Sequence, residues 1–280
     1  MTKKKFSKLM LKYRLLVALS ITLILIISIV TLALHQNHSK AKTSSLIISK
    51  SAELTIRAHN QNFGNRLNRT TNKQPAHDYV IPPVQNGIVP VIYGIPTKLP
   101  VIFLTIDDGI YKEPGDLAIM KAYKLKASFF LVQRFISDEP SFFTTLSTQT
   151  GSLIEDHSYD HYLQTNLSLA QQTQDICSDA DYIIQISGRR PVLFRPPGGD
   201  YNVETQEAAA SCGMKALVMW DVVLDNGIFQ YQYAGDKLHP GDIVLIHFST
   251  TFSEDIAAFV AAAKAQGLQF DLLENWLPSN

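Results

Sequence analysis

VIFLTIDDG, residues 101–109, is a short apolar run that ends in two adjacent carboxylates and a glycine. Its first six residues do not alternate between apolar and polar side chains, which predicts a strand with both faces buried. Strands of this kind belong to parallel sheets that are covered by helices. Because chemistry gathers at the carboxyl ends of such strands, Asp107 and Asp108 stand where a functional site is expected.

Similar apolar runs alternate with helical segments along the rest of the chain. The predicted strands are 101–106, 127–132, 153–154, 192–194, 216–219, 243–246 and 268–270, and the predicted helices are 116–124, 168–187, 204–211 and 253–266. Ser168 and Gln171 form a capping-box pair at the start of one helix, and Ser253 is the predicted N-cap of the last. This order indicates an α/β fold whose parallel sheet is either open or closed as a barrel.

The start of the chain differs in composition from the rest. Residues 1–14 hold six lysine and arginine side chains, and residues 15–34 are a run of twenty uncharged, mostly apolar residues. That run is long enough to cross a bilayer as a helix, and the preceding cations predict a cytoplasmic N-terminus. A signal peptide cleaved near residues 39–41 is the alternative. Residues 35–95 are then an extracytoplasmic linker and lead-in, and residues 96–280 are the main domain.

The charges are unevenly distributed along the chain. The whole sequence has 25 basic and 25 acidic side chains, but residues 76–280 hold 12 basic and 24 acidic ones. An acidic domain lacks the cations that release counterions from a phosphate backbone, so nucleic acid is not an expected partner. The two cysteines, Cys177 and Cys212, form either one disulfide or two buried thiols in an extracytoplasmic domain.

A second polar cluster is HSYDH, residues 157–161, directly after the predicted strand 153–154. Histidines four residues apart project from the same side of a helical turn, which suits two imidazoles on one metal ion. A carboxylate from the end of 101–109 would complete a two-histidine, one-carboxylate face with open positions for water and substrate. Alone, the pair of aspartates before Gly109 is typical of a solvated turn.

Three more segments place polar residues in the same part of the predicted sheet. FRPPGG, residues 194–199, combines prolines that fix the backbone with glycines that leave its amides open to a ligand. LIH, residues 245–247, ends a strand on a histidine, which alone is more typical of a structural residue. WDVVLDN, residues 220–226, adds two aspartates.

In this order and spacing, the segments resemble the NodB-type polysaccharide deacetylases, carbohydrate esterase family four. The resemblance covers about residues 98–275: TIDDG stands for TFDDG, HSYDH for H-S/T-x-x-H, FRPPGG for the R-x-P-Y/G loop, and LIH for L-x-H. KASFFL, residues 126–131, and GRRP, residues 188–191, resemble the K-A-T-F-F strand and the G-x-x-P lead-in. The resemblance implies a distorted (β/α) barrel of about seven parallel strands, preceded here by one transmembrane helix.

The resemblance also implies a divalent metal ion, usually zinc, with three ligands, which are Asp108, His157 and His161. A bound cation acidifies water, and a carboxylate held off the metal takes the proton, a role that falls to Asp107. Arg195 is expected to pair with Asp107 and to keep it ionised.

The remaining implied roles concern the oxyanion and the leaving group. The backbone N–H of Gly198 is expected to stabilise the oxyanion, and His247 to protonate the departing amine. Asp225 is the expected partner of His247 and Asp221 is the competing choice, although either can instead cap a loop.

Two departures from the family pattern affect the substrate groove. Gly198 stands where the family usually has tyrosine. Asn226, the last residue of WDVVLDN, stands where the family often has tryptophan. The groove is therefore expected to be more open than usual. Tyr111, Tyr159 and Tyr201 are predicted either to supply replacement stacking surfaces or simply to pack at the rim.

These expectations describe a hydrolase of carbon–nitrogen bonds other than peptide bonds. It would remove N-acetyl groups from an extracellular polysaccharide, with the N-acetylglucosamine units of peptidoglycan as leading substrate. Chitin-like oligomers, poly-N-acetylglucosamine and O-acetylated xylan are alternative substrates. A catalytically inactive, carbohydrate-binding member of the same fold is the alternative function, and the altered WDVVLDN segment is its best support.

Overall fold

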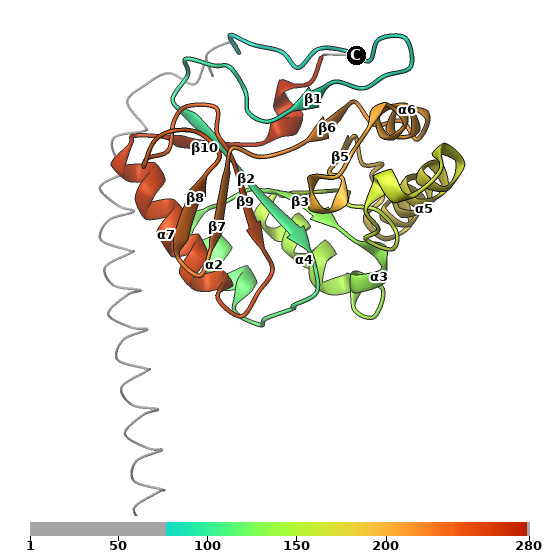
Figure 1. Ribbon diagram of the computed structural model, residues 1–280. Coiled ribbons are helices and arrows are strands. Elements are labelled where there is room, and N and C mark those ends of the chain that lie inside the picture. Colours follow the sequence, from blue (N-terminus) through green and yellow to red (C-terminus); the bar gives the residue numbers. More distant parts are fainter. Residues whose placement is uncertain (1–76, 279–280) are drawn as a thin grey trace, which may run out of the picture. The chain divides into compact units, whose positions relative to one another are not determined.

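A ten-stranded sheet organises residues 77–278, the part of the chain that the computed structural model describes (Figure 1). The strand order is β1-β6-β5-β4-β3-β2-β9-β7-β8, and β10 pairs with the start of β2. All pairings are parallel except that of β7 with β8. The strands are β1 Val91–Ile92, β2 Val101–Asp108, β3 Ser128–Leu131, β4 Leu153–Asp156, β5 Leu193–Phe194, β6 Ala216–Val218, β7 Val222–Asp225, β8 Ile228–Tyr231, β9 Ile243–His247 and β10 Gln269–Asp271.

Helices cover the outer face of this sheet (Figure 1). The α-helices are α2 Asp116–Tyr123, α3 Gln133–Ile136, α4 Pro140–Thr150, α5 Leu169–Ser187, α6 Val203–Ser211 and α7 Phe252–Ala265, and the 3-10 helices are η1 Gln164–Asn166, η2 Pro197–Gly199 and η3 Leu273–Trp276. Within residues 77–278 no helix is both long and apolar enough to cross a bilayer. The predicted anchor at 15–34 lies outside the described residues.

The sheet is a curled half-barrel of mostly parallel strands, which agrees with the distorted barrel that the resemblance implied and leaves the barrel open. Its hydrogen-bonded path ends at β1 and β8, because β6 pairs with β5 and β1 whereas the next strand along the chain, β7, pairs with β9. The lead-in bridges this gap: Gly94 forms an isolated bridge with Asp242, and the N–H of Ile95 donates to the carbonyl of Gly241 at 2.9 Å.

Alternation of side chains along β2 explains how a buried strand delivers polar groups to the interior. Ile102, Leu104 and Ile106 belong to the hydrophobic cluster that lies under the helices. Phe103 belongs to a second cluster on the inner face, and Asp107, four residues further along, projects from that same inner face. The inner face of the half-barrel is therefore apolar near the start of β2 and polar at its carboxyl end.

All seven predicted strands and all four predicted helices are present, with boundary shifts of a few residues. The capping box is confirmed, since the N–H of Ser168 donates to Oε1 of Gln171 at 3.0 Å. The predicted N-cap at Ser253 is wrong, because α7 begins one residue earlier, at Phe252. Thr251 takes the cap position, and its hydroxyl donates to Oδ2 of Asp255 at 3.0 Å.

The two cysteines form a disulfide, which settles the alternative that the sequence left open. Cys177 lies in α5 and Cys212 directly follows α6, and their Cα atoms are 5.0 Å apart. The bond joins the two helices that cover β4, β5 and β6 next to the candidate site.

Candidate active site

Asp107 lies at the carboxyl end of β2 and is held there by Arg195, which follows β5. Nη1 of Arg195 donates to Oδ1 of Asp107 at 2.6 Å and to the hydroxyl of Thr105 at 2.9 Å. The other guanidinium nitrogens donate to the carbonyls of Val218 and Met219, each at 3.0 Å. Arg195 is 0% exposed and Asp107 is 2% exposed. Burial lowers the pKa of Arg195, and the charge of Asp107 opposes that change, so the two buried charges depend on each other.

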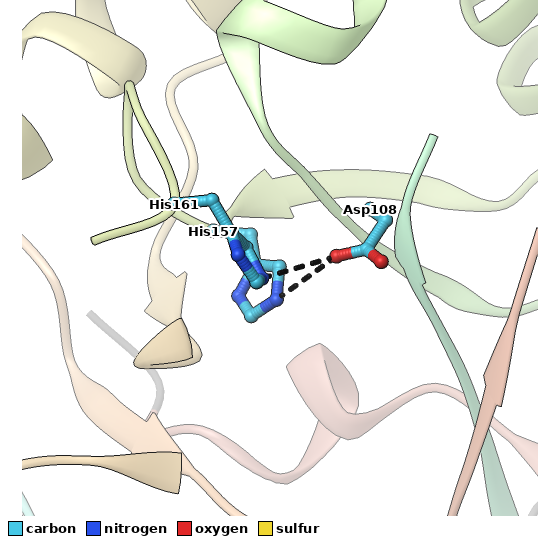
Figure 2. A group of neighbouring side chains, drawn as sticks. All are labelled: Asp108, His157 and His161. Carbon is cyan, nitrogen blue, oxygen red and sulfur yellow. Dashed lines mark ion pairs between the residues drawn. The ribbon is translucent and has the colours of Figure 1, made fainter. Parts of the chain in front are cut away.

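Asp108, His157 and His161 converge beside this pair (Figure 2). Oδ1 of Asp108 lies 3.3 Å from Nε2 of His161 and 3.6 Å from Nε2 of His157. Among residues 77–278 no hydrogen-bond partner is found for this buried oxygen. Burial acts to raise the pKa of Asp108, but the close contact with His161 and the charges of the nearby histidines outweigh it and lower the pKa. One carboxylate oxygen and two imidazole nitrogens within 4.8 Å of one another fit a zinc-type site.

The backbone explains how two neighbouring aspartates reach the same site. Successive side chains of a strand point to opposite faces, yet Oδ2 of Asp107 and Oδ1 of Asp108 both lie 3.6 Å from Nε2 of His157. Asp108 and Gly109 have φ angles of 73° and 85°, in the left-handed region. This turn swings Asp108 toward the interior. A side chain at Gly109 would also collide with Ile136, so a glycine is required there.

His157 is oriented by a backbone carbonyl. Its Nδ1 lies 2.6 Å from the carbonyl oxygen of Arg195, which places the proton on Nδ1 and leaves the Nε2 lone pair directed at the site. Burial is the main cause that lowers the pKa of His157, so the neutral form that ligates metals is favoured.

The segment HSYDH is a loop after β4 and not the helical turn that its spacing predicted. Ser158 and His161 have positive φ angles of 76° and 62°. The N–H of His161 donates to the hydroxyl of Ser158 at 2.9 Å. The two histidines therefore converge, with ring centroids 5.0 Å apart, because the loop folds back on itself.

Two buried carboxylates that sequence reasoning missed hold this loop, one from α5 and one from the end of β4. Oδ2 of Asp179 accepts the N–H of His157 at 3.3 Å, and Oδ1 accepts the N–H of Gln133 at 3.0 Å. Asp156 accepts the N–H of Ser158 at 2.9 Å. Burial raises the pKa of both Asp156 and Asp179 well above the usual range, because each carboxyl group is removed from water next to other carboxyl groups.

The FRPPGG loop places Gly198 in η2 with a φ angle of 62°. A Cβ atom at this position would lie 3.2 Å from Cδ2 of Leu163. Leu163, 48% exposed, therefore occupies the space beside the position where the family pattern has a tyrosine. Among residues 77–278 no acceptor pairs with the N–H of Gly198, which is thus free to donate to a ligand.

His247 ends β9 on the same inner face as Asp107, with which it is paired in register. Val223 pairs with Leu245 in the last registered pair of β7 and β9, and Asp225 and His247 lie two residues beyond it on their own strands. Asp225 is exposed. The N–H of Asp221 donates to the carbonyl of Ile243, which lies four residues before His247, or about 13 Å along the strand. Asp221 is therefore excluded as the partner of His247.

Comparison with known proteins agrees with this architecture. Residues 94–217 match the polysaccharide deacetylase family. An uncharacterized protein of Streptomyces coelicolor is 33% identical over 67% of this chain and 77% of its own. The peptidoglycan-N-acetylmuramic acid deacetylase PdaA of Bacillus subtilis is 26% identical over 64% of this chain and 72% of its own. A peptidoglycan-N-acetylglucosamine deacetylase of Bacillus cereus is 28% identical over 64% of this chain and 89% of its own.

The solved structure of PdaA aligns with a TM-score of 0.57 over 66% of this chain and 84% of that chain, at 23% identity, which shows a shared fold. The chain belongs to the polysaccharide deacetylases, a family of hydrolases. The PdaA structure is a family 4 carbohydrate esterase, and the shared fold agrees with the resemblance that the sequence motifs indicated.

Proposed function

We propose that this chain is a metal-dependent hydrolase that removes N-acetyl groups from extracellular peptidoglycan, at its N-acetylglucosamine units. The observation that carries the proposal is the buried Oδ1 of Asp108, which faces Nε2 of His157 and of His161 without a hydrogen bond among residues 77–278. A divalent cation, with zinc as first choice, held by these three side chains would acidify a water molecule and polarise the acetyl carbonyl.

The two oxygens of Asp107 are suited to different tasks. Oδ1 is bound by Arg195 at 2.6 Å, whereas Oδ2 faces the histidine cluster, 3.6 Å from Nε2 of His157. Oδ2 would therefore take a proton from the attacking water, and the guanidinium would hold the carboxylate in place. This arrangement supports Asp107 as the general base.

The other groups of the site would act on the tetrahedral carbon and on the leaving amine. The free N–H of Gly198 would donate to the oxyanion. His247, in register with Asp107 across the β2–β9 pair, would give its proton to the departing nitrogen.

Charge favours N-acetylglucosamine over N-acetylmuramic acid, whose lactyl group adds a carboxylate or a peptide. Among residues 77–278, Arg195 is the one arginine or lysine side chain that contacts the site residues, and its donors are already occupied by Asp107, Thr105 and backbone carbonyls. Residues 76–280 hold twice as many acidic as basic side chains. An uncharged sugar therefore suits the site better than an anionic one.

The proposal is tested with the full chain, loaded with zinc and compared with its Asp108→Ala variant. We expect acetate release from N-acetylglucosamine oligomers and from peptidoglycan, and we expect the variant to lose both acetate release and stoichiometric zinc. Chitin-like polymers, poly-N-acetylglucosamine, N-acetylmuramic acid glycans and O-acetylated xylan are assayed in parallel to rank substrates. A chain that binds zinc but releases no acetate from any of them would instead be an inactive, carbohydrate-binding member of the family.

We further propose that residues 15–34 anchor the chain in the cell membrane as a single span, with the N-terminus in the cytoplasm and the domain outside. The disulfide between Cys177 and Cys212 supports an oxidising, extracytoplasmic location. A membrane-impermeant protease added to intact cells is expected to digest the domain, and alkaline washing is expected to leave the full chain in the membrane. Release of a shortened chain into the medium would favour the cleaved signal peptide instead.

A further inference from the structure

A pocket of about 460 Å³ lies beside the HSYDH loop, between that loop and the first turns of α5. Tyr159 and Asp160, which line it, stand between the histidines of the candidate metal site. Tyr162 comes directly after the second histidine, and Gln174 and Ser178 belong to α5. The pocket therefore shares one loop with the active site without including any of the three metal-binding side chains.

Large apolar surfaces are left exposed on this loop. Tyr159 is 38% exposed and Tyr162 is 51% exposed. Leu163 adjoins them and reaches over Gly198 on the other side. Exposed aromatic and aliphatic side chains grouped at the rim of a pocket mark binding sites more often than scattered surface positions do.

A network of buried and partly buried hydrogen bonds holds the tyrosine-bearing segments in place. Oδ1 of Asp175 accepts the N–H of Asp160 at 3.1 Å, and Oδ2 accepts Nε2 of Gln164 at 2.9 Å. The same amide of Gln164, which is fully buried, donates to the carbonyl of Tyr162 at 3.0 Å. The N–H of Tyr159 donates to the carbonyl of Asp175 at 3.2 Å. Both tyrosine-bearing segments are thus fixed to α5, so the protein loses less conformational entropy when a ligand binds there.

The chemistry of the pocket fits a neutral pyranose. Tyrosine rings offer flat apolar faces, and the side chains of Gln174, Ser178 and Asp160 offer donors and acceptors for hydroxyl groups. None of the residues that line the pocket is basic, so an anionic sugar or a phosphate would find no partner charge. The lining thus combines apolar faces with uncharged or acidic polar groups.

We propose that this pocket is a glycan subsite. It binds an uncharged N-acetylhexosamine unit while another unit of the same glycan occupies the active site. The proposal rests on the proposed function of the neighbouring site. It makes the length of the oligomer a determinant of affinity, because only a long oligomer reaches both the active site and the pocket.

Binding is measured by calorimetry on the full chain, with a hexamer and a dimer of N-acetylglucosamine as ligands and in the presence of zinc. The Asp107→Asn background prevents turnover during the titration. Tyr162→Ala is expected to weaken hexamer binding about tenfold and to leave dimer binding unchanged, whereas Tyr162→Phe, which keeps the ring, stays close to the background. Gln174→Ala is compared with Gln185→Ala, an exposed glutamine of the same helix outside the pocket.

The outcomes separate this proposal from that of the active site. If the unsubstituted chain releases acetate while Tyr162→Ala and Gln174→Ala bind the hexamer normally, the pocket is not a subsite and the proposed activity stands. If no acetate is released but hexamer binding still depends on the Tyr162 ring, the activity fails and the subsite stands. Equal affinity of the background chain for dimer and hexamer, or no binding of either, overturns the subsite.

Discussion

Replacing Asp107 by asparagine is expected to lower the turnover number for acetate release by about 10²- to 10⁴-fold, the usual contribution of a general base. Asparagine has nearly the same shape, and its Oδ1 can still accept from Nη1 of Arg195, which lies 2.6 Å from the native oxygen. The amide cannot take a proton from water. Zinc content should stay stoichiometric, because Asp108, His157 and His161 are untouched.

The measurement combines acetate release at saturating glycan with metal analysis of the same sample. Asp181→Asn is the matched control, since Asp181 is a surface partner of Arg190 and its side chain is 70% exposed. That variant should keep full activity. Turnover within a few-fold of the native value in Asp107→Asn would remove Asp107 from the role of base, and joint loss of zinc and activity would point to a structural role.

The sheet could be predicted from the sequence because its strands are apolar on both faces and its helices carry clear termini. The β7–β8 hairpin was missed although Asn226-Gly227, with φ angles of 51° and 74°, is a strong hairpin signal. Helix α4 was also missed, since its many serine and threonine residues obscure the pattern of Phe143 and Leu146, but Pro140 at its start was a usable signal.

The grouping of the site residues could be predicted only in part. The ends of β2 and β9 and the loops after β4 and β5 meet in space because parallel strands bring their carboxyl ends to one edge. The detailed geometry depends on left-handed backbone at Asp108 and His161, which spacing alone does not reveal. Helical spacing therefore predicted correctly that the two histidines lie close together, but a folded loop brings them together and not a helical turn.

The buried positions of two carboxylates in α5 could have been predicted from helical periodicity. Asp175 and Asp179 stand four residues apart among Ile176, Ala180 and Ile183, on the buried face of α5. A charged side chain on such a face needs a partner. Here the partners are backbone N–H groups of the HSYDH loop and of Gln133, which no local pattern identifies because the loop and the helix meet only after folding.

Replacing Arg195 by methionine is expected to lower the free energy of unfolding by about 3–5 kcal/mol, the usual cost of removing one partner of a buried ion pair. The guanidinium is fully buried, lies 4.3 Å from the ring centroid of Phe130, and satisfies Thr105, Asp107 and two carbonyl groups. Methionine can fill the volume beside the ring but donates no hydrogen bond, so the charge of Asp107 is left buried without a partner.

Urea denaturation of the full chain measures this change, with Arg190→Met as the matched control. Arg190 pairs with Asp181 at 3.1 Å and the two side chains are 42% and 70% exposed, so its loss should cost under about 1 kcal/mol. Arg195→Lys should fall between the two, because lysine keeps the charge but not the planar fork.

If the loss comes mainly from the unpaired charge, Asp107→Asn combined with Arg195→Met should destabilise by clearly less than the sum of the single changes. If the losses in the free energy of unfolding are additive, the hydrogen bonds of Arg195 with Thr105 and the carbonyls account for its effect on stability. Its charge would then contribute little to the stability of Asp107.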